Sequence, residues 1–280
     1  MTKQTESTSA HAGFRIEKIE PGIAVVTFDR PKKMNGLTAA TKRDLLEALF
    51  HLQFSAGARV IVFMGAGGVF CAGDDVAGYY QEGPSRTNPV GARSDAPDAL
   101  AQRLRLLSQR LNAAVRELDI ITIAAIDGPC IQSGLSLALS CDFRIAAPEA
   151  KLGSATLRFG FQPDENGHWL LVRMIGVAKT LDFLLRKRVV SGAEALELGL
   201  VHELAPQELL FERAIEMAQE FASGPQTAMR ALKRAIHNAA DLTFEQAGED
   251  IAYKTAISDQ NSDAEEGVAA FREKRPPKFS

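Results

Sequence analysis

Residues 122–136 read TIAAIDGPCIQSGLS and combine three structural signals in order. The apolar run Thr122 to Ile126 is typical of a buried strand, and the Asp127-Gly128-Pro129 that follows is a turn signal. Small residues from Ser133 onward favour the start of a helix. Because the first N–H groups of a helix have no partner inside the helix, they attract anionic oxygen. The stretch therefore predicts a strand, a turn and an oxygen-binding helix start.

A second strand with a glycine-rich end lies earlier in the chain. Val60 to Met64 has the pattern of a buried strand, and it ends in Gly65-Ala66-Gly67-Gly68. The segment FCAGDDV, residues 70–76, follows directly. Strands that end in glycine loops commonly present their backbone to ligands, so these two glycine turns are the first candidates for a site.

The N-terminal part of the chain predicts a sheet covered by a helix. Phe14 to Ile19 and Ile23 to Phe28 are strand-like and flank the turn signal Pro21-Gly22, which predicts a hairpin. Behind them, apolar residues recur at helical spacing at Leu45, Leu49 and Leu52. Strands that alternate with amphipathic helices indicate the α/β class.

The remaining segments complete the expected division of the chain. Residues 100–118 have a helical pattern, and residues 78–97 are typical of a long loop beside a pocket. After about residue 205 the strand signals stop, and we expect helices at 206–222, 225–239, 243–257 and 262–274. We therefore expect a disordered tail at 1–12, an α/β core at 13–205 and a C-terminal helical region at 206–280. Helices of this length need packing against another surface, which favours an oligomer.

Composition excludes several classes of partner. The 280 residues carry a formal net charge of -3, so no overall positive field attracts nucleic acid or an anionic membrane. The apolar run Ile120 to Ile126 is far shorter than the roughly 20 residues of a membrane-spanning helix, and residues 1–12 lack the apolar core of a signal peptide. Neither zinc-site nor disulfide spacing relates the three cysteines, Cys71, Cys130 and Cys141. We expect a cytoplasmic protein without a metal site, whose cysteines are small buried apolar groups.

The two glycine turns could stabilise an oxyanion, a property that many unrelated sites share. Removing or adding a proton next to a thioester carbonyl places negative charge on the carbonyl oxygen, and backbone donors shielded from water stabilise that charge. One such donor contributes about 2.7 to 4 kcal/mol in related sites. Two turns at helix starts can supply two donors.

Four sequence elements resemble those of the enoyl-CoA hydratase/isomerase (crotonase) family, in the family's order. They are RPKKMNGL at 30–37, FCAGDDV at 70–76, SGLSLALSCD at 133–142 and FREK at 271–274. The resemblance covers about residues 14–280. It implies an α/β fold, a crotonase-like spiral of ββα units with a C-terminal helical trimerisation region, assembled as a homotrimer or a dimer of trimers. It also implies an acyl-CoA substrate, with coenzyme A as part of the substrate and no other cofactor.

The same resemblance assigns residues to the site. It places two oxyanion donors on the backbone N–H groups of Asp74 and Ser133. It places the adenine and phosphates of coenzyme A near Lys33, Ala72 and Lys274. An acyl-CoA would then be held at its thioester by the main chain and at its phosphates by lysines.

The sequence departs from the hydratase pattern at two positions. Hydratases of this family hold a water between two glutamates, but an ungapped count puts Ser136 and Thr156 at those positions. A hydroxyl, with a pKa far above neutrality, cannot serve as the carboxylate base. Asp164 falls where several branches of the family keep a catalytic aspartate, and we take it as the acid/base.

The surroundings of Asp164 allow two interpretations. One is burial, which would raise the pKa of the carboxyl group, beside Phe159, Phe161 and Trp169. The other is a structural role, in which Asp164 caps a helix that begins near Asn166. Glu165 and His168 lie close enough in sequence to assist or to substitute.

A single base facing an enolate suits double-bond isomerisation, in which a proton leaves one carbon and returns two carbons away. Enoyl-CoA hydratase-like lyase chemistry, acyl-CoA hydrolysis, aryl-CoA dehalogenation and non-catalytic acyl-CoA binding remain alternatives on the same oxyanion hole. A serine hydrolase that uses Ser133 or Ser136 with His168 is a further alternative. It is disfavoured because Gln132-Ser133-Gly134 lacks the nucleophile-elbow pattern.

Overall fold

The computed structural model describes residues 6–75 and 97–280. Its centre is a seven-stranded sheet in the order β1-β2-β3-β4-β5-β7-β10, and a three-stranded sheet has the order β6-β8-β9. The first three strands of the large sheet are antiparallel, and the strands from β3 onward are parallel. The strands are β1 Glu6–His11, β2 Phe14–Ile19, β3 Ile23–Phe28, β4 Val60–Gly65, β5 Ile121–Ile126, β6 Pro129–Ile131, β7 Phe143–Ala146, β8 Lys151–Gly153, β9 Val189–Ser191 and β10 Glu203–Leu204.

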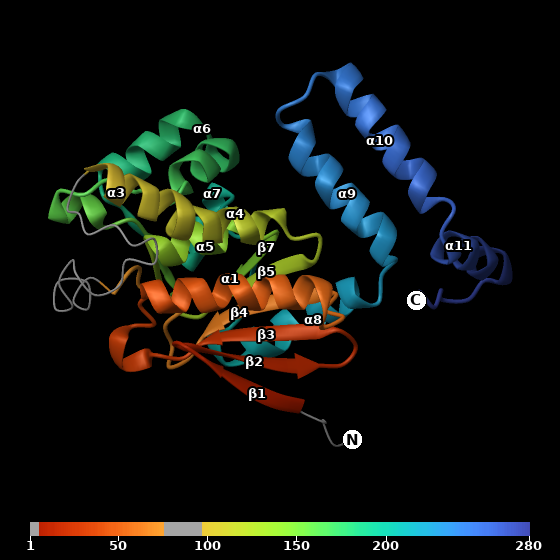
Figure 1. Cartoon of the computed structure of the whole chain (residues 1–280), viewed down its shortest axis with the longest axis horizontal. Coiled ribbons are helices and arrows are strands. Elements are labelled where there is room, and N and C mark those ends of the chain that lie inside the picture. Colours follow the sequence, from red (N-terminus) through yellow and green to blue (C-terminus); the bar gives the residue numbers. More distant parts are fainter. Residues whose placement is uncertain (1–5, 76–96) are drawn as a thin grey trace.

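Helices cover both faces of the large sheet, and a group of helices extends from one end of it (Figure 1). The α-helices are α1 Ala39–Phe54, α3 Pro97–Arg103, α4 Gln109–Glu117, α5 Ser133–Ser140, α6 Gly167–Leu185, α7 Gly192–Leu198, α8 Leu210–Ala222, α9 Gln226–Ala239, α10 Phe244–Ser258 and α11 Ser262–Glu273. The shorter turns are η1 Pro31–Lys33, the π-helical η2 Leu104–Ser108, η3 Thr156–Phe159 and η4 Gln207–Leu209. None of the helices in the described ranges is both long enough and apolar enough to cross a membrane.

Alternation along the strands divides the core into two layers. In β4, Ile61 and Phe63 join the cluster that contains the apolar side chains of α1, α4 and α5. Val60 and Val62 point to the other face and join the cluster that contains α8. Because successive side chains of a strand point to opposite faces, one apolar run supplies both layers. The sheet is therefore buried between helices on its two sides.

Most of the predicted elements are present. The hairpin is β2 and β3, the two glycine-ended strands are β4 and β5, and the helix behind them is α1. The predicted helix at 100–118 is the continuous stretch α3-η2-α4, and the helices expected after residue 205 are α8 to α11. The predicted loop at 78–97 falls almost wholly outside the described residues.

Two boundaries differ from the sequence-based expectation. Residues 6–11 are not a disordered tail, because they form β1 and pair with β2, with His11 opposite Phe14. Helix α8 is not part of a separate appendage, because Leu210, Ala214 and Ala218 are buried against the sheet. The helical region that extends away from the sheet therefore begins after Ala222, with α9 (Figure 1).

Candidate active site

The two segments that follow β4 and β5 lie side by side. The N–H of Cys71 donates to the carbonyl of Pro129 at 3.0 Å, and the N–H of Ile131 donates to the carbonyl of Cys71 at 2.8 Å. This approach requires a glycine at the start of α5, since a Cβ on Gly134 would lie 2.2 Å from the carbonyl oxygen of Cys71. Backbone pairing and a missing side chain thus bring together segments that are 60 residues apart.

The amides of Asp74 and Ser133 make no hydrogen bond among the described residues. Ser133 is the first residue of α5, so its N–H has no partner within the helix. Gly73 has a φ of 106°. A Cβ added to it would lie 3.9 Å from the nitrogen of Ser133, so the two turns are in contact. No hydrogen bond within residues 6–75 and 97–280 uses the N–H of Asp74 or of Ser133. The geometry fits the expected oxyanion hole.

A buried lysine lies beneath these turns. Lys42, on α1, is 3% exposed. Its Nζ donates to Asp74 Oδ2 at 2.9 Å, to Ser108 Oγ at 2.8 Å and to Glu165 Oε1 at 3.0 Å, and it also lies 2.8 Å from Asp74 Oδ1. One ammonium therefore joins α1, the turn after β4, η2 and the segment before α6.

The charges in this cluster shift one another's titration. Burial alone would lower the pKa of Lys42, but the charges of Glu165 and Asp74 together outweigh burial, so the pKa is raised and the lysine stays protonated. Burial, with a further contribution from the charge of Asp74, raises the pKa of Glu165 to about 7 and outweighs the opposing charge of Lys42. The second oxygen of Glu165, Oε2, is buried and has no hydrogen-bond partner in the described structure. Burial therefore disfavours the ionised form of Glu165, although one of its oxygens is bound to Lys42.

The raised pKa of Glu165 predicts a pH-dependent stability. Between pH 4.5 and about 7, the folded protein keeps a proton that the unfolded chain has released. The contribution of Glu165 to the free energy of unfolding should therefore be fully present below pH 4.5 and be lost, on the order of 2 kcal/mol, as the pH rises through 7. Denaturant titrations at pH 5 and pH 8 should show this decrease in the wild type and a smaller one in Glu165→Gln, whereas the exposed control Glu149→Gln should behave as wild type. Equal decreases in wild type and Glu165→Gln would contradict the raised pKa.

Asp164 is held at the site through its backbone. Gln109 Nε2 donates to the carbonyl of Asp164, and Asn112 Nδ2 donates to the carbonyl of Glu165, both at 2.9 Å. Within the described ranges, no ion pair or side-chain hydrogen bond holds the carboxylate of Asp164. Burial, followed by the charge of Asp74, raises the pKa of this carboxyl group. Among the described residues, this carboxyl group therefore combines a raised pKa with no direct ionic partner, which makes it a candidate functional group.

Two expectations about Asp164 are wrong. It does not cap a helix, because α6 begins after Asn166, whose own side chain makes no capping bond. It is not buried by aromatic rings either, since Phe159, Phe161 and Trp169 are 74%, 53% and 37% exposed. Trp169 instead packs against two guanidinium groups, those of Arg116 and Arg173. A short loop held by α4 accounts for the position of Asp164.

Hydroxyl groups occupy the neighbourhood where a hydratase would have glutamates. Thr156 Oγ1 donates to Gln132 Oε1 at 3.3 Å, so Thr156 lies beside the turn that carries Ser133. Ser136 is buried in α5 and packs on Gly167. His168 is exposed on α6, and the described structure shows no hydrogen bond from it to either serine. The arrangement supports neither a paired-carboxylate water site nor a serine–histidine pair.

The three residues expected to contact coenzyme A are not all together. The N–H of Ala72 donates to the carbonyl of Met34 at 3.0 Å, which places Ala72 beside η1 and its exposed Lys33. Lys274 ends α11, at the opposite end of the molecule's long axis from η1 (Figure 1). Lys33 and Ala72 therefore lie at one edge of the candidate site, which we call the rim. Lys274 of the same chain does not reach this rim.

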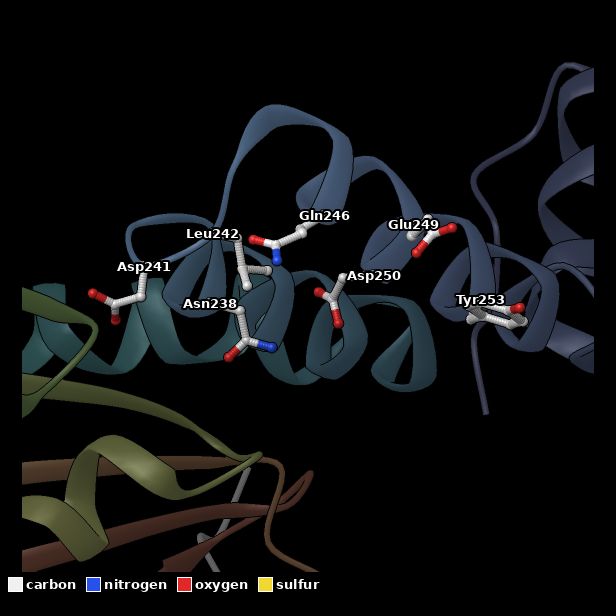
Figure 2. A pocket seen from close by; sticks show the side chains of 7 residues that line it. All are labelled: Asn238, Asp241, Leu242, Gln246, Glu249, Asp250 and Tyr253. Carbon is white, nitrogen blue, oxygen red and sulfur yellow. The ribbon is translucent and has the colours of Figure 1, made fainter.

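A surface pocket of about 450 Å³ lies between α9 and α10 (Figure 2). Its lining residues are Asn238, Asp241, Leu242, Gln246, Glu249, Asp250 and Tyr253. Three of these carry carboxylates, which repel the phosphates of coenzyme A. This pocket is not a candidate acyl-CoA site.

Sequence reasoning missed the residues that support the turns. Lys42 lies three residues before Leu45, so it falls on the same helical stripe as Leu45 and Leu49, and this spacing was the available signal. Ser108 and Gln109 meet the site because the π-helical η2 precedes α4, and nothing in the sequence indicates that turn. The three cysteines are buried, as expected, and burial raises the pKa of each thiol.

Known proteins show the same sequence pattern over most of the chain. A model of the enoyl-CoA hydratase/isomerase family matches residues 18–280. The chain belongs to this family. A mouse relative, "Enoyl-CoA hydratase domain-containing protein 2, mitochondrial", is 38% identical over 92% of this chain and 84% of its own length. The Escherichia coli K12 enzyme "1,2-epoxyphenylacetyl-CoA isomerase" is 28% identical over 95% of this chain and 98% of its own length.

Solved structures of the enoyl-CoA hydratase/isomerase family confirm the predicted fold. The crystal structure of enoyl-CoA hydratase from Bacillus anthracis matches with a TM-score of 0.85 and 29% identity, covering 96% of this chain and 99% of that one. The α/β, crotonase-like architecture is therefore correct, and the protein is an acyl-CoA enzyme of this family.

Proposed function

We propose that this enzyme isomerises the double bond of an enoyl-CoA, with Asp164 as the acid/base. The observation that carries the proposal is the carboxylate of Asp164, which has a raised pKa and no direct ionic partner in the described structure, beside the two free amides. Glu165 is 2% exposed and bound to Lys42, so it is not presented to a substrate. Asp74, the other exposed carboxylate at these turns, is paired with Lys42, which leaves Asp164 as the carboxylate that we assign to proton transfer.

The proposed reaction needs only that group. The N–H groups of Asp74 and Ser133 bind the thioester oxygen of a 3-enoyl ester. Asp164 removes a proton from C2, and the electron pair moves into the carbonyl to give a dienolate whose charge the two amides stabilise. The protonated Asp164 then returns the proton to C4, which leaves the 2-enoyl ester and the original carboxylate.

Hydration is the second candidate, because several relatives carry hydratase names. The mouse relative and the structural match from Bacillus anthracis are both named for hydration. Ser136 and Thr156 argue against it, since neither can hold a water as a carboxylate base would. The Escherichia coli relative is named an isomerase, so the family members similar to this chain include isomerases as well as hydratases.

A panel of substrates tests the proposal. The wild type should convert a 3-enoyl-CoA to its 2-enoyl isomer, and the 2-enoyl-CoA should gain no water. Hydration of the 2-enoyl ester at a comparable rate would assign the second candidate instead. An aryl-CoA halide and a saturated acyl-CoA complete the panel, and release of halide or of free coenzyme A would indicate dehalogenation or hydrolysis.

Lys33 is proposed to bind a phosphate of coenzyme A at the rim beside Ala72. We expect Lys33→Ala to raise KM by about 10-fold with kcat unchanged, because a charged hydrogen bond contributes about 1.5 kcal/mol and forms equally in the ground and transition states. Steady-state kinetics at low and high salt measure this. Lys179→Ala, which removes another exposed lysine, should leave KM unchanged. An unaltered KM in Lys33→Ala would place the phosphates elsewhere.

We propose a homotrimer or a dimer of trimers, assembled through α9 to α11. Large apolar side chains of these helices are exposed in the single chain, among them Phe244, Tyr253 and Phe271 at 90%, 76% and 85%. An assembly would cover them and would bring Lys274 toward the site of another copy. Light scattering gives the mass that decides between monomer, trimer and hexamer.

A further inference from the structure

Lys42 is an ammonium buried among apolar side chains, and its burial costs free energy of hydration. The other buried residues of its helical stripe, Leu45, Leu49 and Leu52, are apolar and pack into the core. Burying an ammonium there requires that its lost hydration be replaced by close hydrogen bonds and opposite charge. Lys42 obtains both from residues that lie 32, 66 and 123 positions away: Asp74, Ser108 and Glu165.

Asp74 connects this lysine to both oxyanion amides. Its Oδ1 accepts a hydrogen bond from Ser133 Oγ at 2.7 Å and is 2.8 Å from Lys42 Nζ. The side chain of Asp74 is 47% exposed, so these two contacts are what fix it. One carboxylate oxygen therefore ties together the two residues whose N–H groups face the thioester, and Lys42 anchors that oxygen to α1.

The charge of Lys42 also matters during the reaction. Enolate formation adds negative charge beside three carboxyl groups, those of Asp74, Asp164 and Glu165. Within the described residues, Lys42 is the only cation paired with Asp74 or Glu165. In a site shielded from water, a nearby positive charge stabilises the enolate more than it stabilises the neutral thioester.

We propose that Lys42 is a positioning residue of the oxyanion hole, which fixes the amides of Asp74 and Ser133 through the Asp74 carboxylate and offsets the charge of the enolate. The role of Lys42 rests on the proposed enolate chemistry, because only that chemistry places an anion at these turns. It acts through Asp74 and Ser133 and makes no contact with coenzyme A. Its loss should therefore lower kcat and leave KM nearly unchanged.

Lys42→Met tests this role, and Lys233→Met is the matched control. Lys233 is also buried, at 6% exposed, and its Nζ donates to Asp142 Oδ2 at 2.6 Å and to the carbonyl of Ile120 at 2.8 Å. We expect Lys42→Met to lower kcat by about 10- to 100-fold, less than the roughly 10²- to 10³-fold of a lost oxyanion donor, with KM within about twofold. Lys233→Met should lower the melting temperature but leave kcat unchanged.

Infrared spectra of bound butyryl-CoA separate this inference from the proposed reaction. With ¹³C at the thioester carbonyl, the wild type should shift the carbonyl band to lower frequency than in water, and Lys42→Met should reverse most of the shift. If the wild type shifts the band and Lys42→Met does not change it or kcat, the role of Lys42 is wrong and the isomerase proposal stands. If no enoyl ester is isomerised but Lys42→Met still reverses the shift, the isomerase proposal is wrong and the role of Lys42 stands.

Glu165→Gln provides a second test if Lys42→Met does not fold. The charged and titratable groups that act on Glu165 are Lys42 from α1, Asp74 from the turn after β4 and the thiol of Cys71. Ionisation of Glu165 above about pH 7 should oppose the enolate, so the wild-type kcat should decline there. Glu165→Gln should remove that decline and raise kcat at pH 8 about threefold or more. Because Glu165 is paired with Lys42, an unchanged kcat of Glu165→Gln at pH 8 would overturn the role assigned to the Lys42 charge.

Discussion

Asp164→Asn is expected to lower kcat for the isomerisation of a 3-enoyl-CoA by about 10³- to 10⁴-fold, with KM within about threefold of wild type. An amide cannot accept the C2 proton, and general acid–base catalysis by one positioned group is worth about 10²- to 10⁴-fold. The expected decrease in kcat lies at the upper end of this range because the same carboxyl group both removes and returns the proton. Substrate binding should persist, since the main chain and the rim hold the thioester and the phosphates.

Controls for Asp164→Asn separate chemistry from folding. Asp259→Asn, at the exposed end of α10, makes the same change in charge and should leave kcat unaltered. The wild-type rate should also fall with decreasing pH at values above the ordinary aspartate range of about 3.9, because the pKa of Asp164 is raised and the base must be ionised. Full activity of Asp164→Asn would remove it from the mechanism and direct attention to Glu165.

Gly134→Ala is expected to lower kcat by about 10²- to 10³-fold and to destabilise the fold by about 1–3 kcal/mol. The added Cβ would lie 2.2 Å from the carbonyl oxygen of Cys71, and 2.8 Å from its Cβ. Both are rigid parts of the core, so the two turns must separate. Separation moves the amide of Ser133 away from that of Asp74, and the oxyanion loses one donor.

Gly248→Ala is the matched control for Gly134→Ala. A Cβ on Gly248, inside α10, meets no atom within 4 Å. This substitution should leave kcat unchanged and stabilise the helix slightly, by about 0.5–1 kcal/mol. Kinetics together with denaturant unfolding of the three proteins distinguishes a displaced site from general destabilisation. A Gly134→Ala enzyme with wild-type kcat would show that the contact between the turns is not needed.

The elements that could be predicted are those whose pattern is local. The hairpin β2–β3, the strands β4 and β5, and the helices α8 to α11 follow from alternation, helical periodicity and turn residues. β1 was missed because Glu6–His11 is a polar edge strand, held by backbone pairing that leaves no apolar pattern. The position of α8 was missed because an amphipathic helix shows which face is buried but not which surface covers it.

The candidate site was predictable only where glycine and the family pattern mark it. The motifs mark the two turns that carry Asp74 and Ser133, and the contact between these turns requires Gly134 because a Cβ there would lie 2.2 Å from the carbonyl oxygen of Cys71. The environment of Asp164 depends on α4 and on Asp74, which are distant in sequence. Lys42 was missed for the same reason: a lysine near a helix start is ordinarily solvated, and its burial depends on carboxylates from two other segments.

The central claim is that the amides of Asp74 and Ser133 bind one thioester oxygen. A crystal structure of the enzyme with butyryl-CoA tests it most directly. The account predicts the thioester oxygen at about 3 Å from both nitrogens, with C2 facing Asp164. A thioester oxygen that contacts neither amide, or only a side chain, would contradict it.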